Sequence, residues 1–211
     1  GKTQVKGDIK VANLDAPVLD INLPEIRIAF ADIRPFDPSL DVLPVDGRFA
    51  GKANVKGNTN KLSTIKADVG ISELRYGKAK ITGTLGVENL DRPNFHFAIK
   101  SPYLNIDELL GEETEDEKAP KEEENEEKSG NPHGLGADVR RQLAKVSGKG
   151  SLDVGRAVFQ DMTFKNFKGR LVMKNGVVNF KALDFDIYGG HISAAGSSFN
   201  LPARHTEYSL K

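Results

Sequence analysis

The sequence predicts a mainly β protein built on an elongated antiparallel sheet, with one or two short helices. Two observations predict this class: apolar and polar residues alternate along most of the chain, and segments with helical spacing are scarce. Alternation gives each strand one apolar face and one polar face. It favours antiparallel pairing, because strands of parallel sheets are covered on both faces and read as unbroken apolar runs. The turn signals between alternating segments indicate about thirteen strands.

The strictest alternation among the first hundred residues falls in four segments: 47–57, 65–72, 78–88 and 95–99. In each segment, small or apolar residues occupy every second position, and mostly charged or polar residues occupy the positions between them. Each segment therefore predicts a strand that buries or covers one face and leaves the other in water.

The final third of the chain alternates in the same way. Asn175-Gly176 lies between two alternating segments, and this dipeptide suits a type I′ hairpin turn because both central residues of that turn need a positive φ. The return strand covers 183–187. Gly189-Gly190 interrupts it, and another strand is expected from Ile192 to Phe199.

Two short segments have helical features. Residues 106–110 can form one turn, and residues 136–146 carry apolar side chains at helical spacing, among them Val139 and Leu143. Helices of this length are marginal alone and depend on tertiary packing. We expect the second one to cap an end of the sheet.

An acidic segment divides the chain. Residues 111–128 hold ten acidic and three basic residues, and the whole stretch 111–134 has very few apolar side chains. Such a segment cannot bury enough surface to offset the entropy of ordering it, so we expect a disordered linker. The alternative is an acidic arm that binds a basic partner or Ca²⁺, although the spacing of a calcium loop is missing. The predicted organisation is a repetitive antiparallel β segment over 1–110, the linker, and a short helix with a second β segment over 135–211.

The chain contains one internal echo. Residues 7–17 and 83–93 share a glycine, a valine and the pattern Asn-Leu-Asp-x-Pro at the same relative positions. A strand is expected after each proline. Repetition at a fixed offset suggests stacked strand units in an elongated sheet.

Composition excludes several classes of function. Lys+Arg and Asp+Glu are both 30, and no basic stripe is present, so we expect no nucleic-acid partner. Cysteine is absent, which excludes a disulfide scaffold, thiolate metal sites and a cysteine nucleophile. The sequence contains neither an apolar run long enough to cross a membrane nor a signal peptide. Because it opens in mid-pattern, we interpret it as an internal piece of a longer protein.

The search for catalytic motifs finds little, and we expect no enzyme activity, no cofactor and no metal site. His191 lies near Asp184 and Asp186, a combination that can supply a general base or metal ligands. Alternation places both aspartates on the polar face of a strand, so we interpret them as solvated surface. The segment 148–151 resembles part of a phosphate-binding loop but lacks the upstream glycine and the following helix.

The apolar faces favour a binding function. A sheet this long, with so little helix to cover it, must fold over, pair with a second sheet or hold a ligand. The composition allows both a closed core and an open trough. The residues expected to line this trough or core are Phe49, Val55, Ile65, Val69, Ile71, Ile81, Leu85, Phe95, Phe97, Ile99, Leu171, Met173, Phe180, Phe185 and Ile187.

Residues 148–201 resemble the AsmA-like family of Gram-negative envelope proteins, near the C-terminal end of its repetitive β region. The resemblance rests on the glycine-led strand at 150–154, the strand at 164–171, the Asn-Gly hairpin at 174–178, the strand at 182–187 and the following Tyr-Gly-Gly. The first hundred residues are similar to the family in style, and the acidic segment departs from its pattern.

The resemblance implies a curled, open sheet in the periplasm, a "β-taco" whose hydrophobic groove accepts phospholipid acyl chains. It also implies an inner-membrane anchor ahead of this chain, a possible partner in the outer membrane or envelope, and a role in phospholipid transfer and outer-membrane integrity. The alternatives are a structural or scaffold protein with a closed core and no lipid cargo, and an enzyme acting on envelope glycans or lipids through His191.

Overall fold

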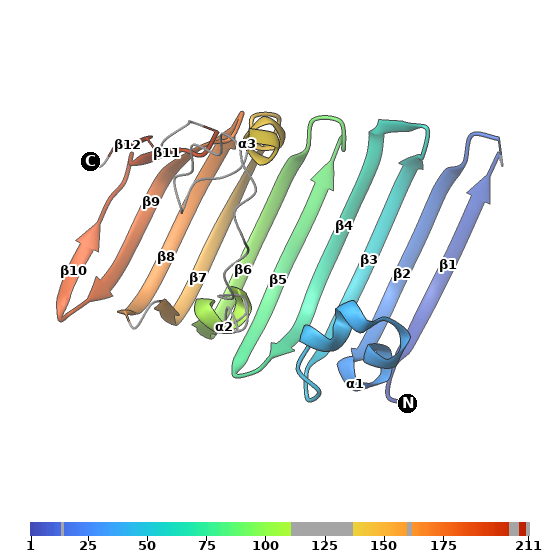
Figure 1. The fold of residues 1–211 in the computed structure, drawn as a ribbon, viewed down its shortest axis with the longest axis horizontal. Coiled ribbons are helices and arrows are strands. Elements are labelled where there is room, and N and C mark those ends of the chain that lie inside the picture. Colours follow the sequence, from blue (N-terminus) through green and yellow to red (C-terminus); the bar gives the residue numbers. More distant parts are fainter. Residues whose placement is uncertain (14, 111–136, 160–161, 203–206, 210–211) are drawn as a thin grey trace, which may run out of the picture.

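The computed structural model of the chain describes residues 1–13, 15–110, 137–159, 162–202 and 207–209. These residues form a single sheet of twelve strands with short helices at its margins (Figure 1). The elements in chain order are β1 (Gln4–Ala12), β2 (Val18–Ala29), α1 (Phe30–Ile33), η1 (Arg34–Phe36), η2 (Pro38–Val42), β3 (Arg48–Asn58), β4 (Lys61–Tyr76), β5 (Ala79–Glu88), β6 (Asn94–Asn105), α2 (Ile106–Leu110), α3 (Ala137–Leu143), β7 (Ser147–Phe159), β8 (Met162–Lys174), β9 (Val177–Ile187), β10 (Gly190–Ser193), β11 (Ser198–Asn200) and β12 (Glu207–Ser209).

The strand order follows the chain from β1 to β9 and continues with β11 and β12, while β10 also pairs with β9. The predicted mainly β class and elongated sheet are confirmed. One part of the prediction is wrong, because β6 and β7 pair in parallel. The helix α2 follows β6 at one edge of the sheet and α3 precedes β7 at the opposite edge, so both strands start from the same side (Figure 1). A long crossover of this kind is what a parallel pair needs.

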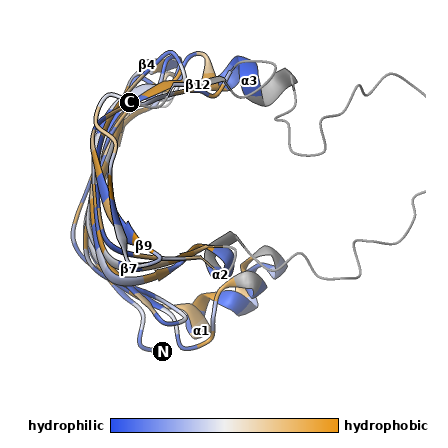
Figure 2. Cartoon of the chain, turned by 90° about the vertical axis from the view of Figure 1, so that its left-hand side faces the viewer, coloured by the Kyte–Doolittle hydropathy of each residue, from blue (hydrophilic) through white to orange (hydrophobic). Residues whose placement is uncertain are grey.

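The sheet is curled and open. Viewed along the direction in which the strands stack, it has the outline of a C whose two lips, formed by the strand ends, do not meet (Figure 2). Register irregularities recur within the strands, for example between Lys6 and Asp8 in β1 and between Ile71 and Leu74 in β4. Bulges of this type bend a strand and increase its twist. The predicted curled sheet with an open groove is therefore confirmed.

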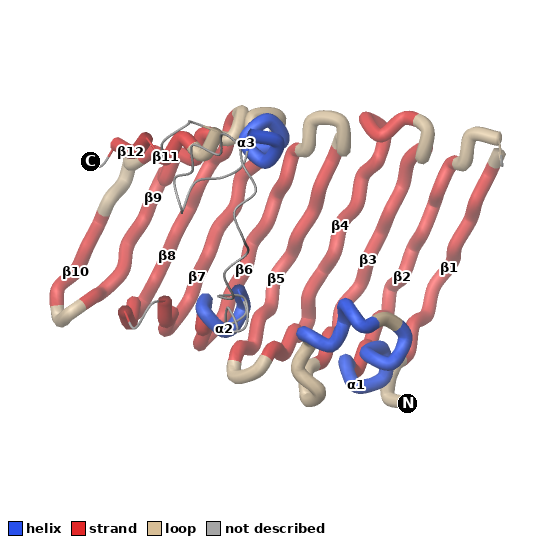
Figure 3. The backbone as a smooth tube through the Cα atoms, viewed as in Figure 1, coloured by secondary structure: helices blue, strands red, loops and turns tan. Residues whose placement is uncertain are grey.

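Short helices lie at the lips and nowhere within the sheet (Figure 3). The expected turn at 106–110 is α2, and the helix expected at 136–146 is α3, which ends three residues earlier because β7 begins at Ser147. The sequence did not predict α1, whose Phe30 is buried and would meet a side chain added at Gly47. The predicted linker 111–134 lies outside the described residues.

The turns confirm the predicted hairpin at Asn175-Gly176 and show what the internal echo forms. Asn175 and Gly176 both have positive φ, at 52° and 75°, as a type I′ hairpin requires. The internal echo marks one repeated turn: Asn13 and Asn89 both have a φ of 57°, and each accepts a hydrogen bond from the amide three residues ahead at 3.1 Å. These turns join β1 to β2 and β5 to β6.

The C-terminal part differs from the prediction. The strand expected from Ile192 to Phe199 is divided into β10 and β11, and both lie beside β9. The division falls at 194–197, where Gly196 has a φ of 88°. The sheet therefore has twelve described strands, close to the expected number.

Few side chains are deeply buried. Among the described residues, the buried apolar side chains are Ile26, Phe30, Ala79, Ile81, Val154, Ala157 and Val178. A β-sandwich of this length would bury many more. No described element forms a second layer over the concave side of the sheet, which stays open between the lips (Figure 2).

Candidate functional site

The candidate site is the concave face of the sheet. Residues paired across neighbouring strands point to the same face, so the register identifies the side chains that lie side by side. One continuous row crosses eight strands from β2 to β9. It consists of Leu23, Ala53, Val69, Leu85, Phe97, Gly150, Leu171 and Phe180.

Two further rows flank the first, and every member of both is apolar or glycine. The row toward the α1 lip consists of Ile26, Gly51, Ile71, Gly83, Ile99, Leu152, Gly169 and Leu183. The row toward the α3 lip consists of Ile9, Ile21, Val55, Ala67, Val87, Phe95, Gly148, Met173, Val178 and Phe199. Together the three rows form an apolar surface that runs along the whole stack of strands, here called the trough.

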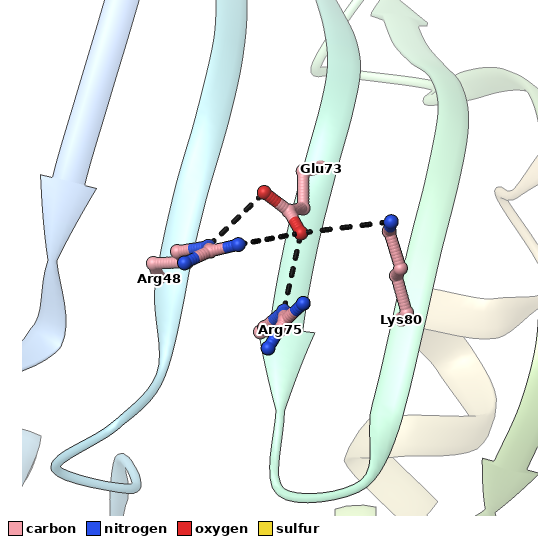
Figure 4. Close-up of polar contacts among 4 residues, drawn as sticks. All are labelled: Arg48, Glu73, Arg75 and Lys80. Atoms are coloured by element: carbon pink, nitrogen blue, oxygen red, sulfur yellow. Dashed lines mark hydrogen bonds and ion pairs between the residues drawn. The ribbon is translucent and has the colours of Figure 1, made fainter.

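The opposite face is charged and lies outside the curl. Figure 4 shows it with the strand order reversed relative to Figure 1, and Arg48, Arg75 and Lys80 stand in front of the ribbon. These three are cross-strand partners. Their neighbours in the chain, such as Phe49 and Ile81, therefore point to the concave side.

The register gathers the predicted lining residues onto this one face. Ten of them belong to the three rows. Phe49 and Ile81 belong to a shorter fourth row, in which both pair with Leu74. Ile65, Phe185 and Ile187 continue the alternation of β4 and β9. The geometry places these side chains on the same face of the sheet. Their role as a lipid lining stays a prediction.

The sequence prediction missed members of the rows that carry the same signal. Leu23, Leu152 and Leu183 alternate as strictly as the predicted residues. Phe164 was missed for another reason: it lies three positions before Phe167, yet both rings contact Phe185, with ring centroids 5.4 and 5.9 Å away. The left-handed residue between them, Asn166 with a φ of 53°, shifts the alternation of β8.

Exposure differs between parts of the trough. Leu85 in the central row and Phe95 in the row toward the α3 lip keep 43% and 36% of their surface exposed, whereas Ile81 and Ile26 on the α1 side keep 9% and 7%. Leu85 and Phe95 therefore remain available to a ligand. At Ile81, in contrast, a substitution would test packing rather than binding.

A close contact between two strands keeps the central row continuous. A Cβ atom added to Gly150 in β7 would lie 2.3 Å from the ring of Phe97 in β6. The ring thus occupies the place that a side chain on the neighbouring strand would take. Glycine at this position lets a large apolar group spread across two strands.

Charges on the outer face join neighbouring strands. Arg48 donates two hydrogen bonds to Glu73, from Nε and Nη2, each at 3.0 Å, and Arg75 Nε lies 3.1 Å from Glu73 Oε1 (Figure 4). The hydrogen bonds from Arg48 are the main cause that lowers the pKa of Glu73 below its ordinary value. These pairs are exposed, and they fix side-chain positions on the outer surface more than they stabilise the fold.

The candidate catalytic histidine lies on this outer face. His191 Nδ1 is 2.8 Å from Asp186 Oδ1, and Asn166 donates a hydrogen bond of 2.7 Å to the other oxygen of Asp186. The hydrogen bond with His191 is the main cause that lowers the pKa of Asp186. The His191 side chain is 62% exposed. Within the described residues, no group of three His, Cys, Asp or Glu side chains is placed to hold a metal ion.

The comparisons with known proteins agree with this geometry. The AsmA family matches residues 45–211, well over half of the chain. The chain belongs to the AsmA family. The match extends the sequence resemblance from 148–201 to all of β3–β6. AsmA proteins are generally non-enzymatic envelope proteins of Gram-negative bacteria. No curated protein and no solved structure matches the chain. No described helix of this AsmA family chain is long and apolar enough to cross a membrane.

Proposed function

We propose that this AsmA family chain is a segment of a non-enzymatic lipid conduit, in which phospholipid acyl chains lie along the trough. The observation that carries the proposal is the combination of an open curl with a continuous apolar concave face whose central row is only partly buried and includes Leu85, which keeps 43% of its surface exposed. A surface of this kind on a folded domain usually serves to bind a partner or ligand. Hydrocarbon fits it, because the three rows carry neither charged nor polar side chains.

The mechanism is solvation of the acyl chain. Each methylene kept out of water contributes about 0.8 kcal/mol, so six methylenes in contact with the trough are worth about 5 kcal/mol. Apolar contacts are non-directional, so a chain that slides from one strand to the next exchanges equivalent contacts. The conduit therefore lowers the barrier that hydrocarbon meets in an aqueous compartment without holding it at one point.

The cellular part of the proposal follows from family membership. We place the segment in the periplasm, within a longer protein held in the inner membrane by an N-terminal anchor. A protein of the outer membrane or envelope is the expected partner at the far end. Phospholipid transfer between the two membranes would then support the integrity of the outer membrane.

The direct test is lipid extraction from the purified chain, with mass spectrometry of the extract, for two matched variants of β5. Leu85→Asp places a carboxylate in the trough, and Leu85 is exposed enough for the fold to accept it. Thr84→Asp places the same charge on the outer face one residue away. We expect bound phospholipid to fall at least about fivefold in L85D, because an acyl chain in the trough would remove water from the new carboxylate, which costs free energy. Bound phospholipid should stay at the wild-type level in T84D.

Photo-crosslinking separates the conduit from the scaffold alternative. A photoreactive residue at Phe97 should label phospholipid tails, and one at His96, on the outer face, should not. Absence of lipid from both the extract and the Phe97 crosslinks would favour a structural role without cargo. The closed core that the scaffold alternative predicts is wrong, because the lips of the sheet stay apart (Figure 2).

A further inference from the structure

The outer face has two parts, which differ in how many of their basic side chains form ion pairs. Across β1–β5, most basic side chains form ion pairs with acidic residues, usually on a neighbouring strand. These pairs are Lys6–Glu25, Arg27–Glu25, Lys56–Asp20, Lys66–Glu88, and Arg48, Arg75 and Lys80 with Glu73. Seven basic side chains thus share four carboxylates within the sheet.

The lysines and arginines on the outer face of β6–β9 lack such ion pairs. They include Lys100, Lys149, Lys168, Arg170, Lys174 and Lys181, and within the described part of the chain none of these six has an acidic group within 4.0 Å. Asp153 and Asp184 are cross-strand neighbours of Lys168 but form no ion pair with it. This part of the surface keeps an excess of positive charge.

Three of these residues surround one depression. Lys149, Arg170 and Lys181, here called the basic cluster, come from the adjacent strands β7, β8 and β9 and line a hollow of about 560 Å³. Its lining also includes small residues such as Thr84 and Ala98 and the larger residues His96, Phe97, Leu171 and Val172. Exposed cations around such a hollow can receive acidic side chains without displacing any internal partner.

We propose that the basic cluster is a docking site for an acidic segment of a partner polypeptide. A lipid bound in the trough is not the ligand of the basic cluster, because the cluster lies on the opposite face of the sheet. The headgroup of a lipid held in the trough would have to pass around a lip to reach it. The proposal therefore stands whether or not the chain carries lipid.

The shape of the surface favours a polypeptide over a membrane. The unpaired cations are spread along the strands, from Lys168 to Lys174 on β8, and this direction is the curved one (Figure 2). A planar bilayer touches a convex surface along a narrow line and would meet few of them at once. A polypeptide can follow the curve and place several carboxylates opposite the cations.

The test uses the purified chain and a fluorescein-labelled peptide of alternating glutamate and serine, about twelve residues long, with binding followed by fluorescence anisotropy. We expect binding at about 20 mM salt and its loss at about 500 mM, because exposed charge pairs are screened. The triple variant Lys149→Glu, Arg170→Glu, Lys181→Glu should bind at least about tenfold more weakly. The triple variant Lys10→Glu, Lys52→Glu, Lys61→Glu has the same net charge and should stay within about threefold of wild type.

Two outcomes would overturn the proposal. One is equal weakening by both variants, which would mean that net charge alone attracts the peptide. The other is binding of phosphatidylglycerol vesicles through the cluster with no binding of the peptide, which would assign the site to a membrane surface. The neutral variant Lys149→Gln, Arg170→Gln, Lys181→Gln replaces the reversed one if the latter loses its β-sheet circular dichroism.

Discussion

At the scale of single residues, the packing of the trough depends on the positions of its glycine residues. Gly150 in β7 leaves room for the Phe97 ring of β6, and Gly51 in β3 leaves room for the Gly70 carbonyl of β4 and for the Phe49 ring of its own strand. A large side chain beside a glycine spreads apolar surface over two positions. The alternation of the sequence identifies the face, but the fit between each ring and its glycine depends on the register.

Gly150→Ala should destabilise the fold by about 1–3 kcal/mol, because the added methyl group displaces the Phe97 ring in a packed contact. Gly169→Ala is the matched control in the neighbouring row: its nearest contact would be 3.4 Å, at the Phe167 ring. Urea unfolding of the two variants measures the difference. Equal destabilisation by both would contradict the contact argued for Gly150.

The pairing of Glu73 gives a prediction about pH. Hydrogen bonds from Arg48 depress the pKa of Glu73, so the stabilisation from this pair is present above the ordinary glutamate pKa of about 4.3 and is lost as the pH falls through the lowered value. Arg48→Gln should raise the pKa of Glu73 in a carbon-detected NMR titration. Lys80→Gln should raise it less, because Lys80 Nζ is 3.9 Å from the carboxylate. An equal rise in both variants would show that general charge, not the hydrogen bonds, sets the pKa.

At the scale of elements, two hairpin turns have similar backbone conformations but different residues. Asn175-Gly176 joins β8 to β9, and Tyr188-Gly189 joins β9 to β10, with φ values of 49° and 79°. Asparagine tolerates the left-handed region, whereas a bulky residue such as tyrosine is strained there. Tyr188 is also 86% exposed, so its ring adds little packing to offset the strain.

Tyr188→Asn should therefore stabilise the chain by about 1 kcal/mol, because it removes left-handed strain from an exposed tyrosine. The reverse change in the other turn, Asn175→Tyr, should destabilise by a similar amount. Thermal unfolding monitored by circular dichroism compares them. A loss of stability in Y188N would indicate that the exposed ring makes a contact worth more than the strain.

At the scale of the whole molecule, stability is distributed along the stack of strands. Each strand from β2 to β9 contacts chiefly the strands beside it, and few side chains are buried in any common core. Proteins built from stacked units resemble one-dimensional systems, in which stability is a sum over neighbours. The edge strands have one neighbour and should be the least stable.

Hydrogen exchange should show this directly. We expect amide protection to be highest in β4–β7 and to fall toward β1 and toward β10–β12. In β1 every side chain is exposed and only one edge is paired. Mass spectrometry of peptides from the native chain at several exchange times measures the gradient. Protection of β1 equal to that of β5 would mean that the sheet unfolds as one cooperative block.

The sequence by itself determined the class of the fold and the composition of both faces, because alternation with a period of two is a local property of each strand. It also determined the turn at Asn175-Gly176, whose left-handed asparagine needs only local conformation. The tertiary structure alone decided that the sheet stays open, that β6 and β7 run parallel, that the cations of β6–β9 lack internal partners, and that Ile81 is packed while Leu85 is exposed. These features depend on bulges, on the crossover between the lips and on cross-strand register, and each of them is set by residues far apart in the chain.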